Sequence, residues 1–445
     1  MDKPLLLAFY GDDFTGSTDA LEFLSRAGAK TALFIEPPTA DQLGRYQGLD
    51  AIGVAGLTRS MPPETMETTL KIAFAELRKL GTRHVHYKVC STFDSSPAIG
   101  SIGRAIDVGH ALFQRQFVPL LVAAPSLGRY CAFGNLFARL GTGSYGTVYR
   151  LDRHPSMSKH PVTPAEESDI RLHLARQTDK ATGLIDLTQL TTSQQFIADS
   201  TTKLIENGAQ VILFDAMEDT QLRSIGELID SYGNPDTPFF SVGSSGVDMA
   251  LGSHWAQTGA LTPVTSWPDP GSANPLLVLS GSCSPVTAGQ IAWARANGFA
   301  EVILDAQTIH DSIIPDAAVA GYVQQAIAHV GQGANVIVHT AGGAVRQHRT
   351  LSSEKLGTAL GQIAREIVRQ TRVKRVVVAG GDTSSYAARA MGIEAVEIIT
   401  ALVPGAPLCR ATAPGSPLDG LEVNFKGGQV GAPDYFGILR AGRVS

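Results

Sequence analysis

A pair of carboxylates stands at the end of the first predicted strand. Residues 5–10 form a continuous apolar run typical of a buried strand, and Asp12 and Asp13 follow it directly. A carboxylate in this position can accept the proton of a hydroxyl group while that hydroxyl attacks phosphorus. The competing interpretation is structural, because Asp is a preferred N-cap and Thr15–Ser17 open a predicted helix. The sequence leaves both interpretations open.

Cations and hydroxyl groups follow two later strands of the same half. Arg59 follows the strand predicted at 51–57, and Lys88 belongs to the strand predicted at 84–89. An arginine can grip a carboxylate through two parallel hydrogen bonds, and the backbone N–H groups at Thr15–Ser17 could bind the same group. The polar residues that follow Lys88 include Ser91, Thr92 and Asp94. Together they predict a site for a small polyol that carries an anion, with a solvated loop charge at Arg59 and a surface ion pair at Lys88 as alternatives.

Loops rich in glycine and hydroxyl groups follow the strands of the second half. Residues 280–287 and 379–384 each follow a strand and open a helix, residues 339–343 end a third strand, and residues 426–431 add a glycine-rich turn with one lysine. Small residues let a phosphate approach backbone N–H groups at a helix N-terminus. A Gly-Gly turn is otherwise a tight connection between a strand and a helix. Several such loops in one half of the chain favour a nucleotide site.

The elements that position these loops indicate an α/β fold. Apolar runs of strand length alternate with helical patterns, which predicts mostly parallel sheets flanked by helices. A chain of 445 residues is too long for one ordinary core, and Pro and Gly crowd residues 258–274. We therefore predict an N-terminal domain at 1–257, a linker at 258–274 and a C-terminal domain at 275–445. Ligands of such sheets bind beyond the carboxyl ends of the strands.

Composition argues against several classes of protein. The formal net charge is −5 and no basic face is evident, so we expect neither nucleic acid nor a membrane as a partner. The four cysteines are far apart, without a CxxC pair, and the N-terminus lacks the pattern of a signal peptide. The histidines form no HxxxH or HExxH pattern, which argues against a protein-bound metal. We expect a cytoplasmic protein with reduced thiols.

Three nucleotide-binding motifs can be set aside. Residues 141–148 fit the protein-kinase glycine-rich pattern GxGxxGxV, but no VAIK lysine, HRD loop or DFG follows in order. We interpret this segment as a turn of a β-ribbon that could serve a homodimer. The chain also has no GxxxxGK[ST] loop, and no GxGxxG follows a strand with an acidic residue about 20 positions later. The second absence weakens the case for a dehydrogenase.

Five motifs of the chain, in order, resemble the four-carbon acid sugar kinase family. Residues 11–19 (GDDFTGSTD) resemble its N-terminal signature and residues 87–96 (YKVCSTFDSS) its second. Residues 160–164 (HPVTP), with Glu167-Ser168-Asp169 after them, are similar to a third. Residues 280–284 (SGSCS) and 380–384 (GGDTS) resemble the signatures of its nucleotide domain. The resemblance extends over essentially the whole chain.

The resemblance implies ATP-dependent phosphorylation of a hydroxyl on an acid such as threonate, erythronate or 3-oxo-tetronate. It implies an acid-sugar domain followed by a nucleotide domain, with the active site in the cleft between them. The residues that should meet the acid sugar are Asp12 or Asp13, Arg59, Lys88, Cys90, Ser91 and Thr92. The residues that should meet ATP, which carries Mg²⁺, are Ser282, Gly380, Gly381, Asp382, Thr383, Gly427 and Gly428. In the expected mechanism Asp13, or Asp12, is the base and Lys88 offsets charge on the phosphoryl group.

Some positions depart from the family pattern. Asp382 stands where a Glu is usual, residues 425–431 (FKGGQVG) replace a KSGNFG-like string, and residues 58–60 vary the usual turn with Asp and Arg. These departures leave the substrate open and admit a branched relative such as 3-oxo-isoapionate. Two other classes remain as alternatives, namely a dehydrogenase or isomerase of sugar acids and a sugar-acid-binding protein without catalysis.

Overall fold

The chain divides into two compact units. The computed structural model describes residues 4–140, 146–160, 162–305, 309, 315–340 and 352–443. Unit 1 contains the chain up to Asp12, then Phe23–Thr31 and Pro37–Thr265, and unit 2 contains Asp13–Glu22, Ala32–Glu36 and the chain from Ser266 onward. Two short N-terminal segments thus group with the C-terminal half, which the periodicity of the sequence does not reveal.

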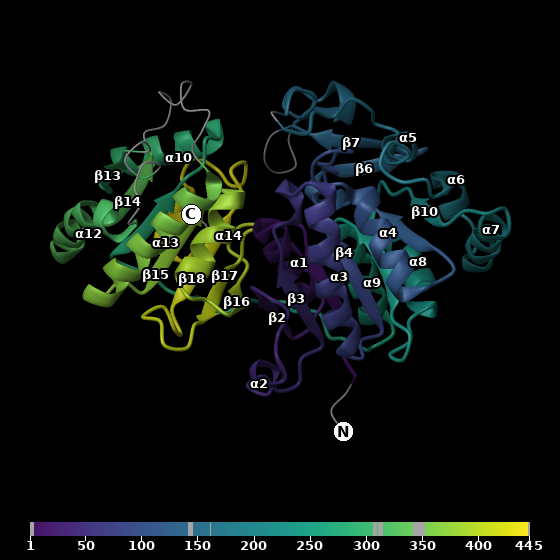
Figure 1. The fold of residues 1–445 in the computed structure, drawn as a ribbon, viewed down its shortest axis with the longest axis horizontal. Helices are drawn as coiled ribbons and strands as arrows, with labels where there is room; N and C mark the ends of the chain where they lie inside the picture. The colour runs from purple at the N-terminus through teal and green to yellow at the C-terminus, as the bar shows by residue number, and fades with distance from the viewer. Residues whose placement is uncertain are drawn as a thin grey trace. The chain divides into compact units, whose positions relative to one another are not determined.

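Unit 1 is built on a parallel sheet of seven strands (Figure 1). Each pair of neighbouring strands among these seven is parallel. In spatial order they are β3 (Ala51–Ala55), β1 (Leu7–Gly11), β4 (His84–Lys88), β11 (Phe239–Gly243), β5 (Val118–Leu121), β10 (Val211–Phe214) and β9 (Thr182–Ile185). The predicted strands at 5–10, 51–57 and 84–89 are therefore adjacent, and their carboxyl ends meet at one edge.

Helices cover both faces of this sheet. Alternate residues of a strand point to opposite faces. Tyr87 of β4 packs against Phe74 of α3, with ring centroids 5.9 Å apart, while His84 lies 6.1 Å from the ring of Trp255 of α9. The helices of unit 1 are α2 (Ala40–Leu43), α3 (Pro63–Lys79), α4 (Ile102–Phe113), α5 (Ile170–Leu174), α6 (Leu187–Leu190), α7 (Gln194–Glu206), α8 (Asp219–Ser231) and α9 (Ser245–Gln257). Helix α1 (Phe14–Arg26) begins in the segment Asp13–Glu22, which groups with unit 2.

A small antiparallel ribbon stands beside this sheet in unit 1. It consists of β6 (Arg129–Ala132), β7 (Asn135–Arg139) and β8 (Val148–Arg150). Because β7 and β8 pair antiparallel, the segment between them connects two strands of a ribbon, as interpreted from the sequence. Residues 141–145 of the GxGxxGxV segment lie outside the described residues.

The sheet of unit 2 is mixed. Its parallel part is β13 (Ala300–Leu304), β14 (Val336–Thr340), β12 (Leu276–Ser280), β15 (Arg375–Ala379) and β18 (Glu422–Lys426). It continues with the antiparallel strands β17 (Leu408–Thr412), β16 (Ala395–Thr400) and β2 (Thr31–Phe34). Strand β2 comes early in the sequence, yet it pairs with β16.

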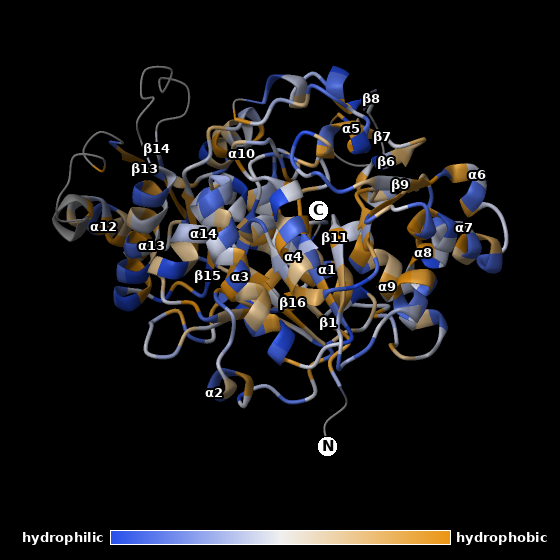
Figure 2. Cartoon of the chain, turned by 45° about the vertical axis from the view of Figure 1, so that its right-hand side comes forward, coloured by the Kyte–Doolittle hydropathy of each residue, from blue (hydrophilic) through white to orange (hydrophobic). Residues whose placement is uncertain are grey.

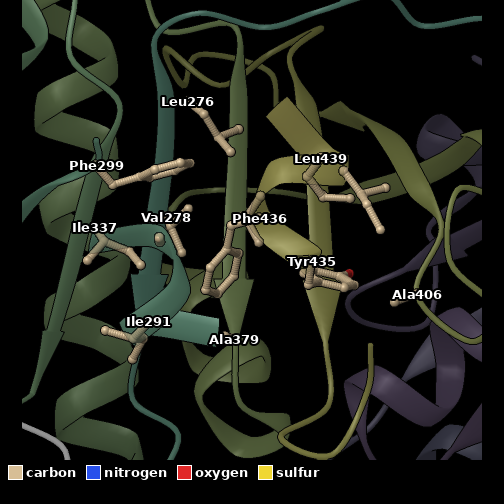
Figure 3. Close-up of a cluster of buried hydrophobic side chains, with 13 residues drawn as sticks. Leu276, Val278, Ile291, Phe299, Ile337, Ala379, Ala406, Tyr435, Phe436 and Leu439 are labelled. Carbon is tan, nitrogen blue, oxygen red and sulfur yellow. The ribbon is translucent and has the colours of Figure 1, made fainter. Parts of the chain in front are cut away.

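The core of unit 2 lies between its sheet and two helices. Tyr435, Phe436 and Leu439 of α15 pack with Val278 of β12 and Ile291 of α10 (Figure 3). The helices of this unit are α10 (Pro285–Ala296), α12 (Pro315–Gly331), α13 (Ser353–Gln370), α14 (Gly381–Ala390) and α15 (Tyr435–Ala441). In both units apolar residues, coloured orange, run along the strands, while helices such as α7 carry blue polar residues (Figure 2).

Candidate functional site

Asp12 lies where three neighbouring strands of unit 1 end. Its backbone N–H donates to the Lys88 carbonyl at 2.9 Å, and its own carbonyl accepts the N–H of Arg59 at 3.1 Å. These two bonds extend the ladders that join β1 to β4 and to β3 beyond the strand ends. The Asp12 side chain is only 2% exposed. The structure therefore brings the predicted residues Asp12, Arg59 and Lys88 to one edge of the sheet.

Asp13 acts as a cap of α1. Its Oδ1 accepts the backbone N–H of Gly16 at 2.7 Å, and its Oδ2 accepts the Thr15 hydroxyl at 2.7 Å. Its carbonyl also accepts the Ser17 hydroxyl at 2.6 Å. The structural interpretation offered for the pair thus applies to Asp13. This cap keeps α1 in place, so a substitution that removes the acceptor oxygen of Asp13 affects structure as well as charge.

Lys88 is a buried cation. Its side chain is 1% exposed and Nζ donates to the Val89 carbonyl at 3.0 Å, so the surface ion pair considered for it is wrong. Burial, together with the charge of Lys88, lowers the pKa of His86 to about 3. Burying the ammonium group of Lys88 costs desolvation energy, and an anionic ligand beside it would offset that cost.

The residues after β4 form a tight turn. Phe93 has a left-handed φ of 56°, and its N–H donates to the Cys90 carbonyl at 2.9 Å. The Cys90 sulfur and the Thr92 hydroxyl lie 3.0 Å apart. Burial, and secondly the charge of Asp94, raise the pKa of Cys90 to about 11, while the charge of Arg59 opposes this shift. The thiol is therefore neutral near pH 7, and Cys90 with its neighbour Ser91 can offer hydrogen bonds but no thiolate nucleophile.

A partly open hollow adjoins this turn. Its empty volume is about 270 Å³, the solvent in its mouth included. The polar residues that line it are Thr92, Asp94, Ser95, Thr163, Glu167 and His173. They come from residues 87–96, from the two signature segments at 160–169, and from α5. Tertiary structure thus joins two signature regions of unit 1, at 87–96 and 160–169, that are about 70 residues apart in sequence.

In unit 2 the loop after β12 is ordered by its own hydroxyl groups. The Ser282 hydroxyl accepts the N–H of Ser284 at 3.2 Å, and the Ser284 hydroxyl caps α10 by accepting the N–H of Val286 at 3.2 Å. Pro285 occupies the first turn of that helix, where its missing N–H costs nothing. Cys283, between these serines, is exposed.

Three of the four glycine-rich loops of unit 2 approach one another closely. Gly380 has a φ of +126°, and a Cβ there would lie 2.9 Å from the Thr383 hydroxyl and 3.4 Å from the Ser282 nitrogen. A Cβ on Gly428 would lie 2.9 Å from the Ser282 hydroxyl. The structure therefore places Ser282, Gly380 and Gly428 together. Gly381, Asp382 and Thr383 open α14, with Asp382 exposed, and Gly427 precedes Gly428.

Buried polar groups hold the Gly427–Gly428 turn. Thr287 donates its hydroxyl hydrogen to the Gly428 carbonyl at 2.9 Å and accepts from Lys426 Nζ at 3.0 Å. The Gln290 amide donates to the Val430 carbonyl at 3.0 Å and to two carbonyls after it. Burial lowers the pKa of Lys426 to about 7. Small residues and two helix N-termini fit a nucleoside triphosphate.

His339, at the end of β14, has structural partners. Its Nε2 lies 2.9 Å from Glu301 Oε1 and its Nδ1 lies 2.9 Å from the Thr340 carbonyl. The next residues of that glycine-rich loop, 341–343, lie outside the described residues. Within the described ranges, no group of three or more His, Cys, Asp or Glu could hold a metal. Nor does any described helix have the length and apolar content that crossing a membrane requires.

Two family models cover most of the chain. A sugar-binding N-terminal domain matches residues 7–251, and a nucleotide-binding C-terminal domain matches residues 277–436. The chain belongs to the four-carbon acid sugar kinase family. It is therefore a sugar-acid kinase with ATP as its co-substrate, and the dehydrogenase, isomerase and non-catalytic alternatives are not favoured.

Similar proteins occur in several bacteria. A 3-oxo-isoapionate kinase of Paraburkholderia graminis is 42% identical over 99% of this chain and 95% of its own length. A 3-oxo-tetronate kinase of Methylobacterium radiotolerans is 30% identical over 97% of this chain and 98% of its own length. A crystal structure of a putative tRNA synthase from Salmonella typhimurium has a TM-score of 0.76 at 25% identity and covers 98% of both chains. These likenesses bear out the two-domain α/β fold.

Sequence reasoning missed part of this kinase's N-terminal unit. Ser95, Thr163, Glu167 and His173 line the hollow but were not among the predicted site residues. Three of them stand in signature strings, at 87–96, 160–164 and 167–169, so the strings themselves carried the signal. His173 carried none, because a single histidine on a helix has no distinguishing pattern.

Proposed function

We propose that the protein transfers the γ-phosphoryl group of ATP to a hydroxyl of 3-oxo-isoapionate or a closely related sugar acid. The observation that carries this proposal is the 42% identity to a 3-oxo-isoapionate kinase, against 26–30% to 3-oxo-tetronate kinases. The higher value extends over both domains, because it covers 99% of the chain.

The acid is proposed to bind at the strand ends of unit 1. Arg59 and the buried Lys88 supply positive charge for its carboxylate, and the Cys90–Thr92 turn supplies neutral hydrogen-bonding groups. Asp12 or Asp13 accepts the proton of the attacking hydroxyl.

The nucleotide is proposed to bind in unit 2. Ser282, the Gly380–Thr383 segment and the Gly427–Gly428 turn would surround its phosphates with backbone N–H groups. Mg²⁺ would arrive with ATP and neutralise charge on the β- and γ-phosphates, and the exposed carboxylate of Asp382 is an oxygen ligand of the type it prefers. We propose residues 1–257 as the acid-binding domain and residues 275–445 as the nucleotide-binding domain. The cytoplasmic location and the homodimer stay predictions from the sequence.

A substrate screen tests the proposal. Purified protein is incubated with ATP, Mg²⁺ and one acid at a time, and ADP release is followed with a coupled assay. The panel is 3-oxo-isoapionate, 3-oxo-tetronate, threonate and erythronate. We expect the highest kcat/KM with 3-oxo-isoapionate. A higher value with 3-oxo-tetronate would reassign the substrate, and no ADP release with any acid of the panel would contradict the proposal.

A further inference from the structure

The Gly427–Gly428 turn of unit 2 contains a peptide that could face either of two ways. The Val430 N–H donates to the Gly427 carbonyl at 3.2 Å, so Gly428 and Gln429 are the central residues of a β-turn. Neither of them has a positive φ, which fits a type I turn. Types I and II differ mainly by reversal of the peptide between the two central residues. Because Gly428 has no Cβ, the turn alone restrains that peptide weakly.

Two buried side chains hold this peptide from one side. The Thr287 hydroxyl donates to the Gly428 carbonyl at 2.9 Å, and Lys426 Nζ donates to the Thr287 oxygen at 3.0 Å. A hydroxyl has one hydrogen and can rotate, whereas an ammonium group can only donate. The Thr287 oxygen therefore accepts from Lys426, and its own hydrogen is left for the carbonyl. Lys426 Nζ in turn lies 5.5 Å from the centroid of the Tyr435 ring, a cation–π position that holds it in place.

The other side of the same peptide presents a donor. The Gly428–Gln429 peptide is trans, so its N–H points away from the carbonyl that Thr287 holds. Gln429 is exposed, and no residue in the described ranges accepts its backbone N–H. The turn also lies against the loop after β12, since a Cβ on Gly428 would be 2.9 Å from the Ser282 hydroxyl. The relay Lys426–Thr287–Gly428 thus fixes a backbone donor beside another loop of the proposed nucleotide site.

This relay costs the folded chain stability. Lys426 has no exposed surface, and burial lowers its pKa to about 7. Among the described residues, no carboxylate forms an ion pair with it. A buried ammonium group without a carboxylate partner costs folding free energy that an apolar side chain of similar length would not. Stability alone therefore does not explain the relay, and its benefit is expected in ligand binding.

We propose that Lys426 and Thr287 are positioning residues of the nucleotide site. Through the peptide that they hold, the Gln429 N–H donates to a phosphate oxygen of ATP. Backbone N–H groups of glycine-rich turns are donors that phosphates readily accept. The inference rests on the proposed function, because it assumes that unit 2 binds ATP. It goes further by adding one phosphate-binding group and the two buried residues that act through it.

Nucleotide binding by substituted proteins tests the relay. The dissociation constant of a non-hydrolysable ATP analogue with Mg²⁺ is measured by calorimetry on the full-length protein. The pH is kept below the pKa of Lys426 of about 7, so that the ammonium form prevails. The variants are Thr287→Val, Thr287→Ser, Lys426→Met and a double variant that combines Thr287→Val with Lys426→Met. Thermal unfolding and the dissociation constant of 3-oxo-isoapionate are measured alongside.

The matched control is Thr371→Val. Thr371 stands at the end of α13, and its hydroxyl donates to the Ile367 carbonyl at 2.6 Å. The control thus removes a threonine hydroxyl that holds a backbone carbonyl of unit 2 outside the glycine-rich loops. It should bind the analogue as wild type does.

The expected losses follow the order of the relay. Thr287→Val should weaken the analogue at least about tenfold, because the Gly428 carbonyl loses its donor. Thr287→Ser, which keeps the hydroxyl, should bind within about twofold of wild type. Lys426→Met should bind several-fold more weakly without a lower melting temperature. Because Lys426 acts through Thr287, the double variant should bind no more weakly than Thr287→Val, and all variants should bind the acid equally.

Three results would overturn the inference and leave the proposed function intact. The first is unchanged binding by Thr287→Val, or an equal loss in Thr287→Ser. The second is a further loss in the double variant, because the charge of Lys426 would then act on the phosphates directly. The third is a lower melting temperature of Lys426→Met, which would assign its loss of binding to the fold. If wild type did not bind the analogue, the proposed function itself would fail.

Discussion

At the scale of single residues, the adjacent Asp12 and Asp13 make different contacts. The backbone of Asp12, after β1, bonds to Lys88 at the end of β4 and to Arg59 beyond β3. The Asp12 side chain is buried. Asp13 uses both carboxylate oxygens to cap α1. Asp13 thus has a structural function, which the sequence alone could not separate from a chemical one.

Asparagine variants distinguish the two aspartates. Asn is as good an N-cap as Asp, so Asp13→Asn keeps the helix while removing the charge. If Asp13 is the base, this variant should lose on the order of 100-fold or more in kcat with an unchanged melting temperature. If Asp12 is the base, Asp12→Asn should show that loss instead. Steady-state kinetics and thermal unfolding of both variants decide the matter, and full activity of both would remove the aspartate base from the mechanism.

The buried His86 makes stability depend on pH. Burial holds its pKa at about 3, below the value near 6.5 of an unfolded histidine. The unfolded chain therefore binds a proton first, and the stability that the neutral ring provides is present above pH 6.5 and lost as pH falls toward 3. We expect a loss of roughly 3 kcal/mol between pH 7 and pH 4 from this residue alone. Urea unfolding of wild type and His86→Gln checks this, since the variant should show a shallower decline over that range. Parallel curves would contradict it.

At the scale of elements, the strands that carry the Asp12, Arg59 and Lys88 loops were predictable from the sequence. Several strands of unit 2 and the pairing of β2 were not. The runs that became β1, β3 and β4 are apolar and continuous, so both their existence and their parallel order follow from the sequence. Strands β16, β17 and β18 carry charges such as Glu397, Arg410 and Glu422 within them, and they went unrecognised. The pairing of β2 with β16 joins residues more than 350 positions apart, and no local pattern specifies it.

The glycines of unit 2 allow a prediction about nucleotide binding. Gly380→Ala forces an alanine to φ +126° and places a methyl group 2.9 Å from the Thr383 hydroxyl. The shift of this loop should raise the KM for ATP at least about tenfold and leave the affinity for the sugar acid unchanged. Gly298→Ala is the matched control, because Gly298 also has a positive φ of +85° but has no neighbour within 4 Å. If both substitutions raised the KM for ATP equally, backbone strain alone, rather than the position of the Gly380 loop, would be responsible.

At the scale of the whole molecule, the two family models and the two clusters of polar loops agree in their division. The sugar-binding model covers the strand ends that hold Asp12, Arg59 and Lys88, and the nucleotide-binding model covers Ser282, Gly380 and Gly428. Each set is assembled by tertiary structure from loops that are distant in sequence. The account therefore assigns one ligand to each set of residues. Substitutions in one set should leave the binding of the other set's ligand unchanged.

Hydrogen exchange, read by mass spectrometry, tests this division most directly. The full-length protein is labelled alone, with 3-oxo-isoapionate, and with a non-hydrolysable ATP analogue and Mg²⁺. The acid should protect peptides that contain residues 11–13, 58–60 and 88–95, and the analogue should protect 280–287, 379–384 and 426–431. The account would be contradicted if the acid protected the loops of unit 2. It would also be contradicted if the nucleotide analogue protected residues 88–95 and left 280–287, 379–384 and 426–431 unprotected.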